Sequence, residues 1–489
     1  MLSKTFTQEK IDEINNIFSK VFEPESITKF ATQSSKNQQQ VEIEELEVYN
    51  VMMSIKSNAC GPDGIPGFIY RDFSFILAKP LCFIINKSFQ QSIVPDTWKK
   101  AHIIPLPKDK TNFRPISLLP YPSKVLEKLF IKFYLLQQTE PHFNHHQFAY
   151  IPHKNLGTSN ALTVFCLHVL NCITAFPSYV RFIAVDFLKA FDKISHEIIL
   201  KTAQNDFFLP NHTVNWLYSF LSNRSQRVHI SNSLFTSWKS CSSGVPQGSI
   251  LGPLLFAMVI NSYGTVSQRS KFVLYADDLT ILHHVPMGMT DESQLEMDNL
   301  IMWAHSTKLF INSSKSYVIN FNPHKLPLPN LSLHQQKIVS TTSIKLLGIT
   351  FTDDLKFNAH FDIIYNKCLQ GMAAINKLYR SGFKGEVLWN CYLSLVFSHL
   401  SYCWPAICDI SSRSFKKFYV IEKRAAKLAS RSTKHINLRE RLNTICTNLA
   451  DKVRKEVDHP LRSCFITRSE QFIPLRSRTP ILPTNRSKN

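Results

Sequence analysis

Two neighbouring acids, Asp277 and Asp278, lie between two strongly apolar runs in the segment 271–282. Each run has the length and composition of a short buried strand, and two turn-forming residues between such runs indicate a tight hairpin. Such a hairpin would mount both carboxylates rigidly near the protein surface. An isolated Asp-Asp pair is also compatible with an ordinary solvated turn, because Asp hydrogen-bonds its own backbone there. A third carboxylate on another strand is needed to favour chemistry.

Asp186 is the candidate for that third carboxylate. It follows the apolar run 181–185 and precedes an amphipathic segment, so it is expected at the end of a buried strand. Its alternative role is to cap the following helix, and Asp192 is assigned to local structure. If the strands are neighbours in one sheet, Asp186 converges with the Asp277–Asp278 pair. Three convergent carboxylates repel unless a hard cation lies among them, and oxygen-only ligands select magnesium or manganese.

Basic residues and a small-residue loop could supply the rest of a site. The runs 101–107 and 112–119 flank a turn and predict a hairpin that carries Lys108 and Arg114. Opposed Lys and Arg suit a triphosphate, although a solvated charged hairpin has the same composition. The loop 242–252 combines small residues, which allow close approach of a ligand, with the amide of Gln247.

The remaining pattern predicts mostly helices. Helical spacing covers residues 75–89, a segment for which Ser123 is the expected N-cap, a helix beginning near Pro253, and residues 295–309. Strands are expected over residues 317–322 and 344–350, and the chain is chiefly helical after about residue 355.

Charge and cysteine content limit the function classes. The chain has 489 residues with 56 Lys and Arg against 36 Asp and Glu, a net charge of +20 that favours a polyanionic partner such as nucleic acid. The apolar runs are too short to span a membrane and no signal segment opens the chain, so we expect a soluble intracellular protein. The eleven cysteines include no Cys-x-x-Cys pair and are expected to be reduced thiols of the core.

Taken in order, these segments resemble a reverse transcriptase of the non-LTR (LINE-like) retrotransposon type. The resemblance is strong over roughly residues 50–355, and the basic helical part beyond fits loosely. The motifs that carry it are Gly61 to Pro66, Phe113 to Leu119, Gln147-Phe148, Asp186 to His196, Gly244 to Pro253, Tyr275-Ala276-Asp277-Asp278, Ser314-Lys315-Ser316 and Leu347-Gly348.

The resemblance implies an α+β right-hand polymerase fold with fingers, a ferredoxin-like palm sheet and a helical thumb. It implies an RNA-directed DNA polymerase that adds dNTPs to a primer on an RNA template, with two Mg²⁺ or Mn²⁺ ions bound by Asp186, Asp277 and Asp278. One ion would lower the pKa of the primer 3′-hydroxyl, and the other would neutralise the triphosphate and the leaving pyrophosphate.

The same resemblance assigns roles to six further residues. Arg114 and Lys108 would contact the triphosphate, Gln247 and Gly248 would shape the nucleotide and template pocket, and Lys315 would protonate pyrophosphate. Phe191 would lie beneath the sugar and exclude a ribose 2′-hydroxyl.

The implied domains are a polar lead-in over residues 1–50, fingers and palm over 51–355 with a core from about 88, a basic thumb region over 356–460 and a poorly ordered basic tail over 461–489. One departure is Ile151, which stands where the family usually has Arg. Another is that the residues before the first motif are too few for an endonuclease domain, so a separate nuclease is a possible partner. The alternative function is an inactive or co-opted element fragment that binds nucleic acid without catalysis. A two-metal nuclease is disfavoured, because it has no role for the Gln247 loop or the basic hairpin.

Overall fold

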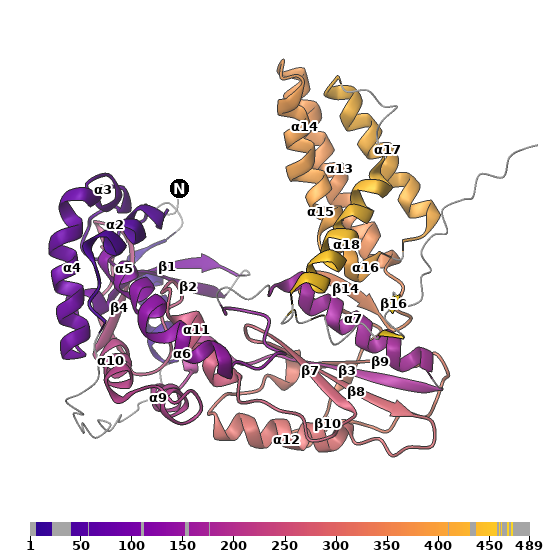
Figure 1. The fold of residues 1–489 in the computed structure, drawn as a ribbon, viewed down its shortest axis with the longest axis horizontal. Helices are drawn as coiled ribbons and strands as arrows, with labels where there is room; N and C mark the ends of the chain where they lie inside the picture. Colours follow the sequence, from indigo (N-terminus) through magenta and orange to yellow (C-terminus); the bar gives the residue numbers. More distant parts are fainter. Residues whose placement is uncertain are drawn as a thin grey trace, which may run out of the picture. The chain divides into compact units, whose positions relative to one another are not determined.

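The structure is a computed structural model that describes residues 6–21, 41–56, 58–108, 112–151, 156–175, 177–408, 410–430, 437–456, 459, 461, 467–468 and 471–472. The chain divides into two compact units, and it passes repeatedly from one to the other. Unit 1 comprises Met1–Pro152, Phe187–Gly264 and Leu300–Asn312, and unit 2 comprises His153–Asp186, Thr265–Asn299 and Ser313–Asn489. Helices and strands are mixed in both units, which confirms the predicted α+β class (Figure 1).

Unit 1 is built from helices around one sheet. Its helices include α1 (Gln8–Ser19), α2 (Glu45–Ser54), α3 (Gly67–Asp72), α4 (Ser74–Gln91), α5 (Tyr121–Phe130), α6 (Leu136–Thr139), α8 (Ala190–Lys193), α9 (His196–Asn205), α10 (Asn211–Leu221) and α11 (Gly252–Ile260). The predicted helix over 75–89 is α4, and Pro253 lies in the first turn of α11 as expected. The expectation that Ser123 caps a helix was wrong, because α5 begins earlier after Pro120, and the Ser123 hydroxyl instead donates to Glu127.

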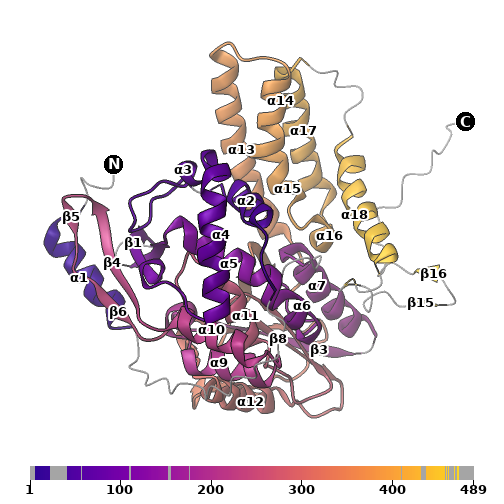
Figure 2. The ribbon, with the colours of Figure 1, turned by 60° about the vertical axis from the view of Figure 1, so that its left-hand side comes forward.

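The sheet of unit 1 has five strands. They are β1 (Lys100–Pro107), β2 (Phe113–Leu118), β4 (Arg224–Ser231), β5 (Leu234–Phe235) and β6 (Lys239–Cys241). β1 pairs antiparallel with β2 and parallel with β4, which also pairs with β5 and β6. α1 packs along β4, β5 and β6 and buries Ile11 and Ile14 against Ile103 and Val228 (Figure 2).

Unit 2 contains the sheet that carries the acids. Its strand order is β12-β9-β3-β8-β7, with β3 (Ser178–Val185) between β9 (Tyr317–Phe321) and β8 (Asp278–Pro286), and with β7 (Ser270–Tyr275) and β12 (Val339–Ser340) at the edges. The side chains of β3 are almost all buried, as expected for its apolar sequence. Helix α7 (Thr158–Ala175) covers one face, where Phe165 meets Phe182 with ring centroids 4.9 Å apart.

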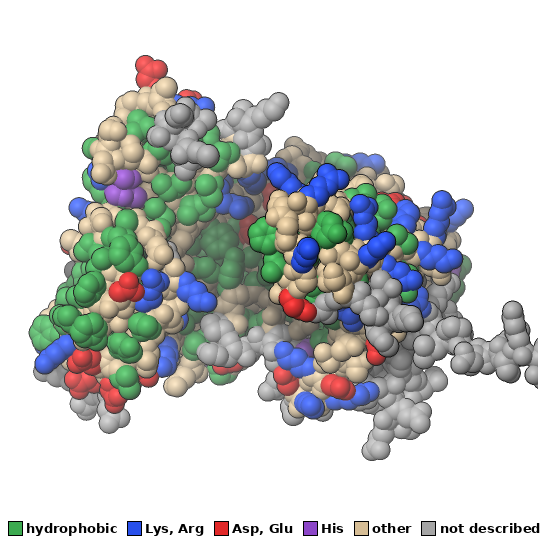
Figure 3. All heavy atoms as spheres, turned by 90° about the horizontal axis from the view of Figure 1, so that it is seen from above, with side chains coloured by type: hydrophobic (Ala, Val, Ile, Leu, Met, Phe, Trp, Pro, Cys, Tyr) green, Lys and Arg blue, Asp and Glu red, His purple; other side chains and the backbone are tan. Residues whose placement is uncertain are grey.

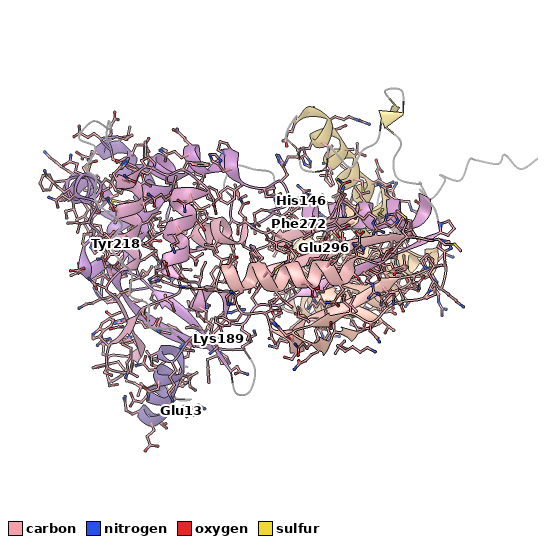
Figure 4. The ribbon with its side chains drawn as sticks, turned by 90° about the horizontal axis from the view of Figure 1, so that it is seen from below. Glu13, His146, Lys189, Tyr218, Phe272 and Glu296 are labelled. Atoms are coloured by element: carbon pink, nitrogen blue, oxygen red, sulfur yellow. The ribbon has the colours of Figure 1, made fainter. Side chains whose placement is uncertain are left out.

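A buried ion pair fixes the far end of β3. Arg181 lies 2.7 Å from Asp291, both side chains are almost inaccessible, and the Tyr179 hydroxyl also donates to Asp291. Helix α12 (Ser293–Ser306) starts just beyond, and its Glu296 accepts the N–H groups of Val266 and Ser267. Figure 4 labels Glu296 on this helix and Phe272 on β7. These bonds hold β3 in place. The strand then leads to Asp186 at its other end.

One predicted strand is a hairpin. Residues 344–350 were expected to be continuous, but β13 (Ser343–Leu346) and β14 (Ile349–Thr352) pair antiparallel around Leu347 and Gly348, whose φ angles are +45° and +87°. Glycine adopts positive φ readily, so Gly348 permits the turn inside an apolar run. The small hairpins β10 (Ser332–Leu333) with β11 (Gln336–Lys337) and β15 (Thr467–Arg468) with β16 (Gln471–Phe472) complete the strands of the described residues.

The segment after residue 355 is helical, as predicted. Its helices are α13 (Asn358–Arg380), α14 (Glu386–Tyr392), α15 (Ser398–Ser401), α16 (Trp404–Ile407), α17 (Ser412–Leu428) and α18 (Leu438–Lys455). They share one hydrophobic core with α7 and the sheet of unit 2. Figure 3 shows Lys and Arg side chains gathered over the helical part of this unit. The basic tail 461–489 lies almost wholly outside the described residues, and the division into fingers, palm and thumb remains a prediction.

Candidate active site

The predicted site residues fall into one set in each unit. Unit 2 contains Asp186, Asp277, Asp278 and Lys315, and unit 1 contains Lys108, Arg114, Phe191, Gln247 and Gly248. Each set draws on separate segments of the chain.

The hairpin of β7 and β8 presents the two adjacent acids differently. β7 ends at Tyr275, which pairs with Asp278 at the start of β8, so Ala276 and Asp277 form the turn. Ala276 has a φ of +58°, as a tight turn requires. The hairpin was predicted correctly, but its turn lies one residue earlier than expected. Asp277 is therefore a turn residue, and Asp278 is held by strand pairing.

Asp186 lies beside this hairpin tip. β3 ends at Val185, which pairs with Leu279 of β8, so Asp186 leaves β3 next to the residue where β8 begins. Desolvation by the surrounding protein, followed by the charges of Asp277 and Asp186, raises the pKa of Asp278 to about 6. Asp278 keeps much of its accessible surface, so protein atoms crowd its carboxyl group without enclosing it. The three acids predicted from separate motifs thus act on one another electrostatically.

Ser316 ties the Lys315 segment to Asp186. The backbone N–H of Asp186 donates to the buried Ser316 hydroxyl, with N and O 3.3 Å apart. Lys315 is exposed in the turn Ser313–Lys315, immediately before β9, and β9 is the neighbour of β3. The lysine therefore lies in the turn before β9, the strand next to β3, which leads to Asp186.

The donor chemistry of the three acids fits a divalent cation. Carboxylates are the ligands that Mg²⁺ and Mn²⁺ prefer, and a cation would stabilise the ionised form of Asp278, whose pKa is raised by desolvation and by repulsion from Asp277 and Asp186. Among the described residues, however, no three His, Cys, Asp or Glu side chains are already arranged as a metal shell. The set fits a metal by its chemistry and position rather than by a preformed coordination geometry.

In unit 1, the Gln247 loop is fastened to α8 and to β2. The Gln247 side-chain amide donates to Asp192 at 2.7 Å. The backbone carbonyl of Gln247 accepts the N–H of Ser117 on β2 at 2.9 Å. Gly248 has a φ of +152°, and a Cβ at this position would overlap the carbonyl oxygen of Ser117. The close approach expected of a small residue is therefore present, although its partner is the protein backbone.

Phe191 and Asp192 are joined to the same loop. The Val245 N–H donates to the Phe191 carbonyl at 2.8 Å. The Phe191 ring stacks on Phe256 of α11 with centroids 4.5 Å apart, and the ring of Tyr150 meets it edge-on at 6.1 Å. Two neighbouring rings thus set the position of the predicted sugar-contact residue.

Asp192 was assigned to local structure, but its carboxylate joins two of the predicted contacts. Burial raises its pKa, while the hydrogen bond from Gln247 and the charges of Lys189 and Arg114 lower it. Arg114 is exposed on β2, opposite Leu106. Lys108 follows β1 and closes the hairpin through its N–H to the carbonyl of Asn112, and residues 109–111 lie outside the described residues.

Glu127 was missed by the sequence analysis. Its fully buried carboxylate accepts the N–H groups of Ile250 and Leu251 at 2.7 and 2.9 Å, where the Gln247 loop enters α11. Burial raises its pKa, and hydrogen bonds together with the buried Arg224 lower it. The sequence contains one indication of this role. Glu127 lies within the apolar face of α5, and a buried acid requires a hydrogen-bonding or charged partner.

The sequence family described as reverse transcriptase (RNA-dependent DNA polymerase) matches residues 106–351. The RNA-directed DNA polymerase from mobile element jockey of Drosophila melanogaster is 26% identical over 343 residues, which are 66% of this chain and 36% of that protein. The probable RNA-directed DNA polymerase from transposon X-element of the same species is 25% identical over 71% of this chain and 39% of its own length. The type-1 retrotransposable element R1 polyprotein of Bradysia coprophila is 26% identical over 66% of this chain and 32% of its own. The chain thus spans about a third of the length of these relatives.

Among solved structures, telomerase from Candida tropicalis in complex with a fragment of telomeric RNA aligns with a TM-score of 0.41 and 12% identity, over 79% of this chain and 66% of that one. The telomerase without RNA aligns with a TM-score of 0.40 and 11% identity, over 78% and 74%. Within the part of the chain that the structure describes, no helix is long and apolar enough to cross a membrane.

Proposed function

The chain belongs to the reverse transcriptase (RNA-dependent DNA polymerase) family, and we propose that it is an RNA-directed DNA polymerase of a non-LTR retrotransposon. The observation that carries this proposal is the position of Asp186 at the end of β3, beside the hairpin of Asp277 and Asp278, where the three charges interact. The substrates are a nucleic-acid primer, an RNA template and dNTPs.

Asp186, Asp277 and Asp278 are the proposed ligands of two Mg²⁺ or Mn²⁺ ions. When bound, these ions would make the primer 3′-hydroxyl more acidic and neutralise the triphosphate. The protein itself supplies rigid mounting, because Asp278 is held by its strand and Asp186 by its backbone bond to Ser316. Such positioning and charge complementarity provide most of the catalysis in phosphoryl transfer.

The loop of unit 1 is the proposed nucleotide-shaping element. Gln247 is oriented by Asp192, and Phe191 is held against Phe256, so both side chains are pre-positioned before a nucleotide binds. Arg114 and Lys108 are the proposed triphosphate contacts, and Lys315 is the proposed proton donor to pyrophosphate. The regions around these sets would be the fingers and palm, with α13 to α18 as the thumb.

Primer extension tests the proposal. Wild-type protein, an RNA template, a labelled primer and dNTPs should give extended products with Mg²⁺ and none with excess chelator. The double variant Asp277→Asn, Asp278→Asn should lose at least about a thousandfold in rate, because the neutral amides cannot replace carboxylate charge around the ions. Glu296→Gln, in the same unit but at the start of α12, is a control for preparation and folding. If the wild-type protein extends the primer no faster than the double variant, the polymerase proposal is wrong. The alternative, a fragment that binds nucleic acid without catalysis, would then remain.

A further inference from the structure

The five-stranded sheet of unit 1, whose strands all lie within the described residues, contains no acidic residue on any strand. Its strands carry Lys100, Arg114, Arg224, Arg227 and Lys239, and no Asp or Glu. In the whole chain, acids number 36 against 56 basic residues, so an acid-free sheet exceeds the general basic bias. A surface of this composition favours a polyanionic ligand.

Only one face of this sheet is covered by α1. Alternate residues of the strands, such as Ala101, Ile103 and Val228, pack against α1, which turns the acidic Glu13 to solvent (Figure 4). The opposite face, here called the open face, is defined by the residues that alternate with these. The pairs His102–Arg227 and His229–Phe235 place the central members side by side. The open face includes Lys100, His102, Arg114, Arg227, His229 and Phe235, all of which except His102 keep accessible surface, and the alternation also places the apolar Ile104, Leu106, Ile116 and Leu118 on it.

Four near-parallel rings form a cluster around Arg227 on the open face. The imidazoles of His102 and His229 lie 4.1 Å apart at 5°. Trp238, between β5 and β6, lies 5.8 Å from His102 at 27°, and Phe235 lies 6.2 Å from His229 at 21°. Phe235 is 43% exposed, so the cluster presents an accessible ring.

Cations are part of this ring cluster. The guanidinium of Arg227 lies 4.7 Å from the Phe235 centroid and 4.6 Å from the Trp238 ring, and its Nε and Nη2 are both 3.1 Å from Nε2 of His102. The ammonium of Lys100 lies over Trp238 at 5.5 Å. Burial and the neighbouring charges lower the pKa of His102 to about 4, so its neutral ring accepts the arginine donors at neutral pH. The positive charges are therefore held beside aromatic planes.

We infer that the open face of this sheet binds a single-stranded nucleic acid, with bases on the ring cluster and phosphates on Lys100 and Arg227. Aromatic rings stack on bases that are unpaired, and basic side chains beside them follow the phosphates. An acidic peptide would satisfy the charge but would leave the rings without planar partners. The inference needs no catalysis by the acids of unit 2, so it goes beyond the proposed polymerase function.

Fluorescence anisotropy with labelled oligouridylate and oligothymidylate of about 16 nucleotides tests this inference. The buffer contains excess chelator, so loss of polymerase activity and loss of this site are distinguishable. The main variant is Phe235→Ala, Lys100→Gln, because both side chains are exposed and their removal spares the core. Trp238→Ala is the second variant. Phe83→Ala, Lys87→Gln is the matched control, since it removes an exposed Lys–Phe pair 5.8 Å apart on α4.

We expect each open-face variant to weaken single-strand binding by about tenfold or more, as the loss of one stacked base would. The control should stay within about twofold of wild type. A hairpin duplex of the same length should lose less affinity than the single strands, because its bases are paired. Similar binding of RNA and DNA would assign the contacts to bases and phosphates, whereas a preference for RNA would add the 2′-hydroxyl. Unchanged affinity in the Phe235 and Lys100 variant, equal loss in the control, or equal loss on the duplex would each overturn the inference.

Discussion

At the scale of single residues, the sequence predicts chemistry-bearing side chains where the local pattern is unusual. Asp277 and Asp278 interrupt apolar runs, and Asp186 follows one, so composition alone indicated these positions. Asp192 and Glu127 were not predicted as site residues, because their partners, Gln247 and Leu251, are remote in sequence. A hydrogen bond across such separations depends on tertiary packing, which one sequence does not reveal.

Phe191 allows a prediction on sugar choice. Its ring stacks on Phe256 and meets Tyr150, so its position is set by neighbours and its removal leaves a space rather than a rearranged backbone. Phe191→Val should raise ribonucleotide incorporation relative to deoxyribonucleotide incorporation by about tenfold or more, through loss of a steric contact of a few kcal/mol at most. The measurement is the ratio of kcat/KM for the two nucleotides in primer extension.

Phe207→Val is the matched control, because Phe207 is a buried ring of the same unit that contacts Phe143 instead. It should lower stability without changing the nucleotide ratio. Equal ratios in wild type and Phe191→Val would remove the sugar-contact role.

At the scale of elements, strands and helices with clear periodicity were predicted well, and their ends less well. The β7–β8 hairpin was expected, yet the turn is shifted to Ala276 because that residue adopts a positive φ. The run 344–350 was read as one strand because its apolar pattern continues through Leu347 and Gly348, where the chain in fact reverses. A turn inside an apolar run is difficult to predict, because a single glycine is the only residue in it that indicates a turn.

Glu127 offers the prediction at this scale. Glu127→Ala would leave the N–H groups of Ile250 and Leu251 without their acceptor and the buried Arg224 without a nearby charge. We expect the free energy of unfolding to fall by about 3 kcal/mol or more, as measured by urea denaturation. The KM for dNTP should also rise, because the loop that carries Gln247 loses one of its attachments.

Glu127→Gln distinguishes hydrogen bonding from charge. Both N–H groups are accepted by Oε2, and the other oxygen faces the Ser123 hydroxyl, so a glutamine can keep all three contacts. The raised pKa of Glu127 also indicates that its environment tolerates a neutral group. We expect Glu127→Gln to recover most of the stability and the KM. Glu47→Ala, which removes a surface pair with Lys132, should cost less than about 1 kcal/mol. If Glu127→Ala were as mild as Glu47→Ala, the anchoring role would be wrong.

At the scale of the whole molecule, the sequence predicted the charge and the family, and the division into fingers, palm and thumb stays a prediction. The predicted boundaries followed sequence order, whereas each compact unit is assembled from separate segments. The motifs of one predicted site are therefore distributed over both units, with the acids in unit 2 and the Gln247 loop in unit 1. Long-range strand pairing creates this division, and local patterns do not encode it. Net charge is a sum over residues, so it follows directly from the sequence.

The net charge of +20 leads to a prediction on salt dependence. Lys416, Lys423, Arg424 and Lys427 are exposed along α17, whereas the one acid of this helix, Glu422, is buried and paired with Arg441. A basic helix face of this kind neutralises phosphates and releases counterions on binding. We therefore expect the affinity for duplex nucleic acid to fall steeply between about 50 and 200 mM salt.

Replacing these four residues of α17 by Gln should weaken duplex binding and make the slope of log K against log salt shallower by about 0.9 for each phosphate that the helix no longer neutralises. The measurement is anisotropy at several salt concentrations, with circular dichroism as the check of folding. Lys79→Gln, Lys87→Gln is the control, because it removes two exposed charges from α4 in the other unit. It should leave the slope nearly unchanged if binding is localised. An equal change per charge in both variants would instead mean that duplex affinity follows total charge, and α17 would then have no specific role.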